Sequence, residues 1–307
     1  MPDDFPAALL VVLHISPSAT SALPQILERA GHLTARHAEN LEAIEPGHIY
    51  VAPPNAHLVV SGGRCVLDPG PKLNGHRPAI DALFRSVAQE YGSRSAGVVL
   101  SGVLDDGTVG LLAIKRAGGT TLAQDPDDAH YPGMPASAIE YVQPDHVATA
   151  ADLGRLLDEF AQASRPHPLS ERGAMHEQFV EEVIRGATED PQPGESFGLT
   201  CPECQGAIWV TSDAGTESFR CRVGHVYTEE SFAAADAARV ETALWTALRA
   251  LEERAALQRR MAARARARGQ RLRADLYESS AAGATEDAVV LRDVLASFVA
   301  GADEEVA

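Results

Sequence analysis

The first half of the sequence alternates short apolar runs with amphipathic stretches, and this alternation restricts the possible folds more than any other feature. The apolar runs are ALLVVLHI at 8–15, HIYVAPP at 48–54, HLVVSG at 57–62, AGVVLSG at 96–102 and TTLAQD at 120–125. Helical patterns lie at 23–29, 78–89 and 109–116. Val- and Leu-rich strands separated by helices are typical of a mostly parallel sheet covered on both faces. Residues 1–163 are therefore predicted to form a doubly wound α/β domain.

Two shorter segments follow this domain. Residues 164–198 have prolines near both ends and one helical pattern at 177–185, which indicates a linker. Residues 199–228 are a compact segment that contains three of the four cysteines of the chain. We expect this segment to fold as a small zinc-ribbon-like module.

The C-terminal region, residues 229–307, is rich in Ala, Leu and Arg and is predicted to form an α-helical hairpin, broken near Gly269 and again near 281–284. An apolar stripe at helical spacing needs a partner surface: Val240, Leu244, Leu248 and Leu251. The stretch 254–273 holds eight arginines and no acidic residue. It could bind an anionic lipid or nucleic acid, but a solvated helix face is favoured because the interleaved residues are mostly Ala.

Charge and hydropathy exclude several classes of function. The 307-residue chain has a formal net charge of −17, which argues against nucleic-acid binding. The apolar run at 7–13 is too short for a signal sequence or a membrane span, so no membrane insertion is expected. The chain is predicted to be cytoplasmic, where clustered cysteines are more typical of metal sites than of disulfides.

His14 and Asp106 are the first candidates for chemistry. His14 ends the first apolar run, and Asp106 lies in the loop SGVLDDG after the run at 96–102. The carboxyl ends of parallel strands are where open α/β sheets build their sites, so the two side chains could meet there. A carboxylate that accepts a hydrogen bond from an imidazole fixes its tautomer and stabilises the imidazolium. The alternative is that His14 is a solvated loop residue and DDG an ordinary turn.

Five motifs together resemble the CheB-type protein-glutamate methylesterases, over roughly residues 7–160. They are VVLHISPSATSALPQIL, EPGHIYVAPPNAHL, NGHRPAIDALF, VVLSGVLDDGTVGLLAIKRAGG and LAQDPDDAHYPGMPASAI, in the order of the family. The resemblance implies a hydrolase of chemotaxis-type phosphorelay signalling. Its members hydrolyse γ-glutamyl methyl esters on chemoreceptor helices, and some also deamidate glutamine. It implies no cofactor for catalysis.

The resemblance also implies roles for individual residues. His14 is similar to the general base, and Asp106 to the carboxylate that orients it. The backbone N–H of Val103 would form half of the oxyanion hole, and Asp105 stands where the family usually has Asn.

Three further residues resemble family positions near the site: His76, Arg77 and Met134. Arg77 could hold substrate carboxylates, or it could, with His76, brace the helix that begins at Pro78; the sequence leaves both interpretations open.

The nucleophilic serine of the family lies in a Gly-x-Ser-x-Gly-Gly turn N-terminal to the histidine strand. Here 13 residues precede His14, none of them serine, and the first glycine is Gly31. We expect a start that lies downstream of the serine in a longer protein; the alternative is a serine-less, inactive CheB-like binding module. The implied partner is a methylated chemoreceptor or a related signalling protein, and a separate response regulator or methyltransferase is a further candidate.

The cysteine cluster predicts a metal site. Cys201-x2-Cys204 is followed, after sixteen residues, by Cys221-x3-His225. Two such pairs flanking a β-hairpin supply four ligands in a tetrahedron, which suits a structural Zn²⁺ in a zinc ribbon. The alternatives are a reduced cluster without metal, which is disfavoured because so small a module has little other core, and a redox dithiol, for which the third cysteine and the histidine would be a coincidence.

Overall fold

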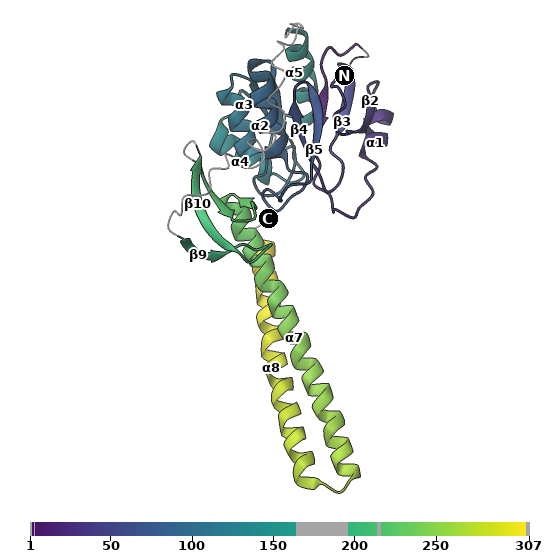
Figure 1. Cartoon of the computed structure of the whole chain (residues 1–307), viewed down its shortest axis with the longest axis vertical. Helices are drawn as coiled ribbons and strands as arrows, with labels where there is room; N and C mark the ends of the chain where they lie inside the picture. Colours follow the sequence, from purple (N-terminus) through teal and green to yellow (C-terminus); the bar gives the residue numbers. More distant parts are fainter. Residues whose placement is uncertain (1, 3, 164–195, 214–215, 305–307) are drawn as a thin grey trace. The chain divides into compact units, whose positions relative to one another are not determined.

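The computed structural model describes residue 2 and residues 4–163, 196–213 and 216–304 (Figure 1). They fold as two compact units, residues 1–232 and residues 233–307. The strands of the first unit are β1 (Leu9–Val11), β2 (Thr34–His37), β3 (His48–Val51), β4 (His57–Ser61), β5 (Arg64–Asp68), β6 (Ala96–Val99), β7 (Thr120–Gln124) and β8 (His146–Ala148), followed by β9 to β12. Its helices are α1 (Leu23–Ala30), α2 (Ile80–Tyr91), the 3₁₀ turn η1 (Gly92–Arg94), α3 (Thr108–Arg116), α4 (Gly133–Val142) and α5 (Ala150–Ala163).

The strands of the α/β region form two parallel ladders and one hairpin. The ladders have the orders β1-β3-β2 and β6-β7-β8, and β4 pairs antiparallel with β5. All five apolar runs form strands, as predicted, and the three predicted helices are α1, α2 and α3. Strands β2 and β8 were not predicted because TARH and HVA each carry too few apolar residues to stand out from loops.

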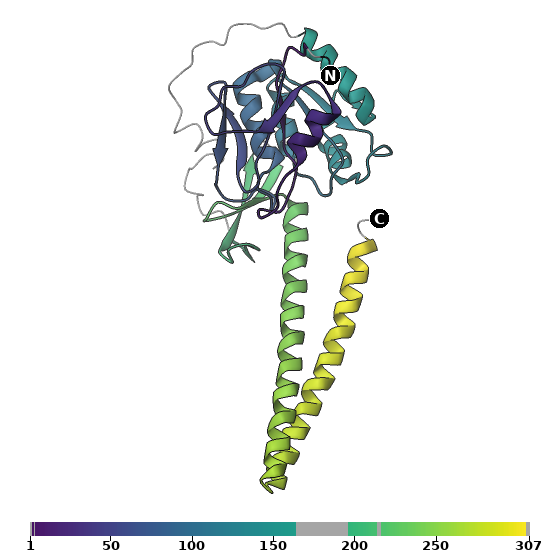
Figure 2. The same cartoon turned by 90° about the vertical axis from the view of Figure 1, so that its right-hand side faces the viewer.

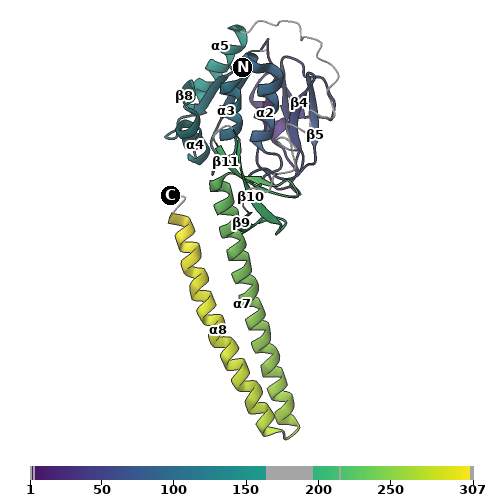
Figure 3. The same cartoon turned by 60° about the vertical axis from the view of Figure 1, so that its left-hand side comes forward.

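Helices α2 and α3 pack together and build the core beside the strands (Figure 3). Leu83 and Phe84 of α2 share one buried cluster with Leu111 and Ile114 of α3. These side chains recur three and four residues apart, so each helix presents one apolar face. Their packing fixes the N-terminal ends of both helices next to the loops that carry the candidate site.

The cysteine-containing segment is a four-stranded antiparallel ribbon in the same unit as the α/β region. Its strands are β9 (Ser196–Thr200), β10 (Ala207–Asp213), β11 (Thr216–Cys221) and β12 (Val226–Tyr227), in the order β12-β11-β10-β9. Strand β9 begins inside the segment expected to be the end of the linker. The helical pattern predicted at 177–185 lies outside the described residues.

The C-terminal region forms the predicted hairpin of two long helices, α7 (Glu229–Ala267) and α8 (Arg271–Glu304) (Figure 2). The chain reverses at Gly269, whose φ of +70° is open to glycine without strain. The second break, predicted near 281–284, was wrong: α8 is continuous there, and Ala281 and Ala284 are buried small residues. None of the described helices is both long and apolar enough to cross a bilayer.

Candidate active site and metal cluster

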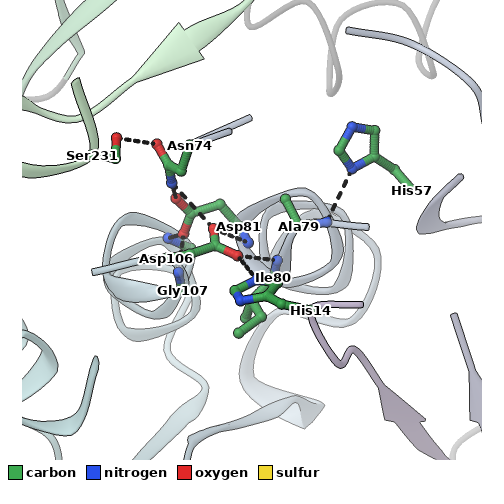
Figure 4. Close-up of polar contacts among 10 residues, drawn as sticks. His14, His57, Asn74, Ala79, Ile80, Asp81, Asp106, Gly107 and Ser231 are labelled. Atoms are coloured by element: carbon green, nitrogen blue, oxygen red, sulfur yellow. Dashed lines mark hydrogen bonds and ion pairs between the residues drawn. The ribbon is translucent and has the colours of Figure 1, made fainter. Parts of the chain in front are cut away.

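His14 and Asp106 meet in a direct hydrogen bond, as the sequence predicted (Figure 4). The loop after β1 carries His14, and the loop between β6 and α3 carries Asp106. The Nε2 atom of His14 lies 2.7 Å from Oδ2 of Asp106. The Asp106 side chain is 2% exposed, whereas 22% of the His14 side chain faces solvent. The pair therefore has a buried carboxylate behind an imidazole that solvent can reach.

His14, together with the amino end of α2, holds Asp106 in its ionised form. Oδ2 of Asp106 accepts a hydrogen bond from the Ile80 N–H at 2.7 Å, and Oδ1 accepts one from the Asp81 N–H at 3.4 Å. Burial alone would raise the pKa of Asp106, but the hydrogen bond with His14, its charge and the Ile80 N–H outweigh burial and lower that pKa. Asp106 is thus an anion that accepts hydrogen bonds.

The ionised Asp106 fixes the tautomer of His14. Because the carboxylate can only accept, the Nε2 atom of a neutral His14 carries the proton and donates it. The Nδ1 atom then has the free lone pair, and it has no hydrogen-bond partner among the residues that the structure describes. The atom available to take a proton from a nucleophile is therefore Nδ1.

Asn74 and Asp81 extend this pair into a buried polar network that the sequence did not predict. The Nδ2 atom of Asn74 donates to Oδ1 of Asp106 at 3.1 Å and to Oδ2 of Asp81 at 3.0 Å. Oδ1 of Asp81 accepts from the N–H groups of Gly107 and Gly110. Burial and the neighbouring Asp106 raise the pKa of Asp81 to about 7. Asp106 therefore remains ionised to a lower pH than Asp81 does.

His76 covers one face of the His14 ring. Its ring stacks on the ring of His14, with centroids 3.8 Å apart and planes 6° from parallel. Burial, and then the adjacent His14, lower the pKa of His76 to about 4. His76 is therefore a neutral, flat surface that restricts the rotation of the His14 ring at neutral pH.

Val103 and Met134 shape the loop that leads to Asp106. Val103 is exposed, and its N–H donates to no acceptor within the described segments, so it is free to bind a ligand oxygen. Met134 is buried and donates its backbone N–H to the Gly102 carbonyl at 2.8 Å. A Cβ on Gly102 would lie 2.1 Å from Sδ of Met134, so a larger residue there requires the Met134 side chain to move. Met134 thus contacts the loop at Gly102 and helps to hold it in place.

Arg77 braces the surrounding loops. Its Nη1 donates to the carbonyls of Pro69 and Gly70, and its Nε and Nη2 both donate to Oδ1 of Asn55. No hydrogen bond joins it to His14 or Asp106 in the part of the chain that the structure describes. These contacts are with loops and not with the helix that begins near Pro78, so both interpretations of Arg77 stay open.

His57 is fully buried, and no sequence pattern predicted its role. Its Nδ1 accepts from the Ala79 N–H at 3.2 Å, so its Nε2 carries a proton and donates to the Pro71 carbonyl at 3.0 Å. Burial lowers its pKa. His57 thereby ties the loop before Asn74 to the start of α2, as Figure 4 shows for the Ala79 contact.

The second cluster brings together the four predicted metal ligands Cys201, Cys204, Cys221 and His225, whose ligand atoms all lie within 4.8 Å of one another. Sγ of Cys204 is 3.6 Å from Sγ of Cys221, too far for a disulfide bond. The Nδ1 atom of His225 lies 3.7 Å from Sγ of Cys201 and 3.5 Å from Sγ of Cys221. This is a closed Cys₃His set with every ligand atom facing one point.

Comparison with known proteins agrees with the site. Residues 1–157 match the family model described as CheB methylesterase, which is half of the chain. The chain belongs to the CheB methylesterase family. The match ends before the ribbon and the helical hairpin. Those two regions therefore lie beyond the part that defines the family.

Individual CheB proteins and a solved CheB structure are also similar to this chain. A protein-glutamate methylesterase/protein-glutamine glutaminase of Paraburkholderia xenovorans is 40% identical over 159 residues, covering 50% of this chain and 44% of that protein. One from Anaeromyxobacter dehalogenans is 37% identical over 162 residues, covering 53% and 48%. The chain thus spans less than half the length of these relatives. The Thermotoga maritima CheB methylesterase catalytic domain is 36% identical, with a TM-score of 0.50 over 52% of this chain and 86% of that one.

Proposed function

We propose that this chain carries the base and the orienting carboxylate of a protein-glutamate methylesterase. The observation that supports this most strongly is the 2.7 Å bond between Nε2 of His14 and the buried Oδ2 of Asp106. A base held in one tautomer by a carboxylate is the arrangement that serine esterases use to activate a hydroxyl. Family membership favours this function over a serine-less binding module.

The reaction is acyl transfer in two halves. In the first, Nδ1 of His14 takes the proton of a serine hydroxyl as its oxygen bonds to the ester carbonyl carbon, and the ion pair with Asp106 stabilises the imidazolium. The imidazolium then returns the proton to the leaving methoxide, which departs as methanol. In the second half, His14 takes a proton from water, the water oxygen attacks the acyl carbon, and the serine leaves with the proton. The products are a glutamate carboxyl group and free enzyme.

The N–H of Val103 is our candidate donor to the oxyanion in both halves. It lies in the loop that also carries Asp106 and is unpaired among the described residues, as a donor to a transient charge must be. Asp106 and this N–H thus come from one loop, held from behind by Met134. We propose a methylated chemoreceptor as the substrate-bearing partner, and glutamine side chains as alternative substrates.

The test is methanol release from methylated chemoreceptor by two purified proteins. One is this 307-residue chain, and the other extends it upstream through the in-frame coding sequence. Activity that appears in the extended protein and is lost on His14→Ala substitution supports the esterase. If the extended protein contains the serine turn, folds and releases no methanol, the esterase proposal fails.

We also propose that the Cys₃His cluster binds one structural Zn²⁺. A tetrahedral site with Zn–S bonds of about 2.3 Å and Zn–N bonds of about 2.0 Å has ligand-to-ligand edges of roughly 3.5–3.8 Å. Three of the six distances between ligand atoms measure 3.5, 3.6 and 3.7 Å, and all six are within 4.8 Å. Four protein ligands leave no position for water, so the ion would stabilise the ribbon and take no part in hydrolysis.

A further inference from the structure

We propose that the metal-binding ribbon is part of the active site: it fixes the side chain of Asn74, which in turn positions Asp106 against His14. This inference rests on the proposed esterase function and adds a positioning residue and a metal-dependent support to it. The residues that carry it come from three segments far apart in sequence, and Figure 4 shows the chain of contacts from Ser231 through Asn74 to Asp106.

Asn74 has one amide orientation that satisfies all its contacts. Its Nδ2 faces the two carboxyl groups of Asp81 and Asp106, which are acceptors. Its Oδ1 accepts from the Thr228 N–H at 3.2 Å and from the Ser231 hydroxyl at 3.3 Å. A flipped amide would place Oδ1 against the carboxyls and NH₂ against the Thr228 N–H, so the ribbon side and the carboxyl groups select the same orientation.

The ribbon side of this contact is itself rigidly built. Thr228 is the residue before α7, and its Oγ1 accepts from the Ser231 N–H at 3.2 Å. In return, Oγ of Ser231 accepts from the Thr228 N–H at 2.9 Å, and this N–H is shared with Oδ1 of Asn74 at 3.2 Å. This reciprocal pairing is a capping box, which fixes the first turn of a helix. Both donors to Asn74 therefore come from one preorganised turn.

Both pairs of metal ligands anchor the ribbon to the segment that leads into Asn74. Glu203, between the first two cysteines, forms an ion pair with Lys72 at 2.5 Å. Gly224, between Cys221 and His225, has a φ of +104° and approaches Pro71 so closely that a Cβ would lie 3.0 Å from Cγ of that proline. Residues 71 and 72 thus contact the two ligand turns directly.

Strand β12 completes the attachment. The Asn74 N–H donates to the Val226 carbonyl at 2.8 Å, and Val226 is buried in one cluster with Leu73, Val59 and Ala82 of the α/β region. Tyr227 is fully buried and packs against Phe232 of the first helical turn. A four-ligand metal site is what gives so small a ribbon its stability, because such modules bury little apolar surface of their own. Metal loss should therefore release Asn74.

The test measures how firmly Asp106 holds the imidazole, in the full chain and without any need for activity. The Nε2–H proton of His14 is observed by NMR in ¹⁵N-labelled protein loaded with Zn²⁺, is assigned by its loss in His14→Gln, and its exchange with water is timed. Four variants are compared with the unmodified chain: Asn74→Ala, Ser231→Ala, Cys204→Ser and, as a matched control, Ser218→Ala. Ser218 is a ribbon serine whose hydroxyl bonds to Thr211 instead of Asn74.

Exchange of the His14 proton should be at least about tenfold faster in Asn74→Ala and Cys204→Ser. This is the change in rate expected when a hydrogen bond to a charged group is removed. Exchange should be intermediate in Ser231→Ala and unchanged in Ser218→Ala. Unchanged exchange in Cys204→Ser, with the ribbon amides fully exposed, would overturn the inference. So would unchanged exchange in Asn74→Ala. If Asn74→Ala also loses amide protection throughout α2 and α3, the variant has disturbed the fold, and the result of Ser231→Ala then decides whether the inference stands.

The outcome separates this inference from the esterase proposal. Ribbon-dependent protection of the His14 proton in an extended protein that releases no methanol would sink the esterase and leave the positioning role standing. Methanol release with the same kcat in wild type and Asn74→Ala would sink the positioning role and leave the esterase standing. If both proposals hold, kcat should fall about 10- to 100-fold in Asn74→Ala with KM little changed, because Asn74 contacts Asp106 and not the substrate.

Discussion

The rings of His14 and His76 stack face to face at 3.8 Å, so the catalytic candidate shares one face with a second titratable ring. Two protonated imidazoles at this separation would repel each other, and His76 is also desolvated. This explains why its pKa is lowered to about 4, mainly by burial and then by His14. The stacked pair should therefore carry at most one charge above that pH.

Replacing His76 with Phe should reduce the pH dependence of stability. His76 is protonated more readily in the unfolded chain than in the folded one, so its contribution to stability is complete above about pH 6.5 and is lost as the pH falls toward 4. Wild type should lose more free energy of unfolding between pH 7 and pH 4.5 than His76→Phe, which keeps a stacked ring without a charge. Urea titrations at several pH values measure this.

A matched control is His130→Gln, because His130 is exposed and lies outside the network. It should show the wild-type slope. Equal slopes for wild type and His76→Phe would contradict the assignment of His76 as a buried neutral ring.

Asp106→Asn should lower kcat for ester hydrolysis by at least about 10³-fold in the upstream-extended protein, because an amide neither fixes the His14 tautomer nor stabilises the imidazolium. Asp105→Asn is the control: Asp105 makes no contact with His14, and the amide oxygen of Asn can still accept the hydrogen bond that Thr228 gives to Asp105. Burial, and then nearby acidic groups, raise the pKa of Asp105 to about 6, and its Oδ1 is buried without a partner. Asp105→Asn should therefore keep full activity and unfold at higher denaturant concentration at pH 8. Comparable losses in both variants would refute the assignment.

The purified chain should contain one Zn²⁺. Loss of an outer-shell partner of a metal site lowers affinity roughly 10- to 100-fold, and Cys204→Ser, which removes a ligand itself, should lower the affinity for Zn²⁺ by more than that. Isothermal titration with Zn²⁺ and metal analysis measure this. Cys65→Ala is the matched control: Cys65 is buried in the α/β core, away from the cluster, and should retain the metal. Metal retention in Cys204→Ser would show that the cluster is not the site.

The sequence predicted the strands whose apolar runs are long and three of the helices, and it missed β2, β8 and the helices α4 and α5, although α4 and α5 carry apolar residues at helical spacing. The runs at 8–15 and 96–102 are long enough to be recognised, whereas β2 and β8 are short and carry polar residues. The break expected near 281–284 was wrong because Ala-rich stretches are also good helix formers, and burial of Ala281 and Ala284 decides in favour of the helix. Local propensity alone cannot supply that tertiary information.

The resemblance to a family named residues that lie together in the structure, whereas it did not identify contacts that arise between distant segments. His14, Asp106 and His76 come together as expected. Asn74 also lies in a recognised motif, but its significance depends on Thr228, which is 154 residues away in sequence. No pattern in the sequence predicts that pairing, because it arises only when the ribbon packs on the segment before α2.

Gly102 and Met134 should show strong energetic coupling. Gly102→Ala places a Cβ 2.1 Å from Sδ of Met134, and such overpacking costs about 1–3 kcal/mol of unfolding free energy. Met134→Ala opens the space that the new methyl needs. In the double variant the cost of Gly102→Ala should therefore shrink by about 1 kcal/mol or more, a coupling typical of residues in contact. Urea unfolding of the four proteins in the cycle measures this coupling.

Gly154→Ala is the control. A Cβ at this position in helix α5 meets nothing within 4 Å, so the substitution should stabilise the fold slightly. If the costs of the two single changes simply add, Met134 does not hold this loop, and the Val103 N–H would depend on some other contact for its position.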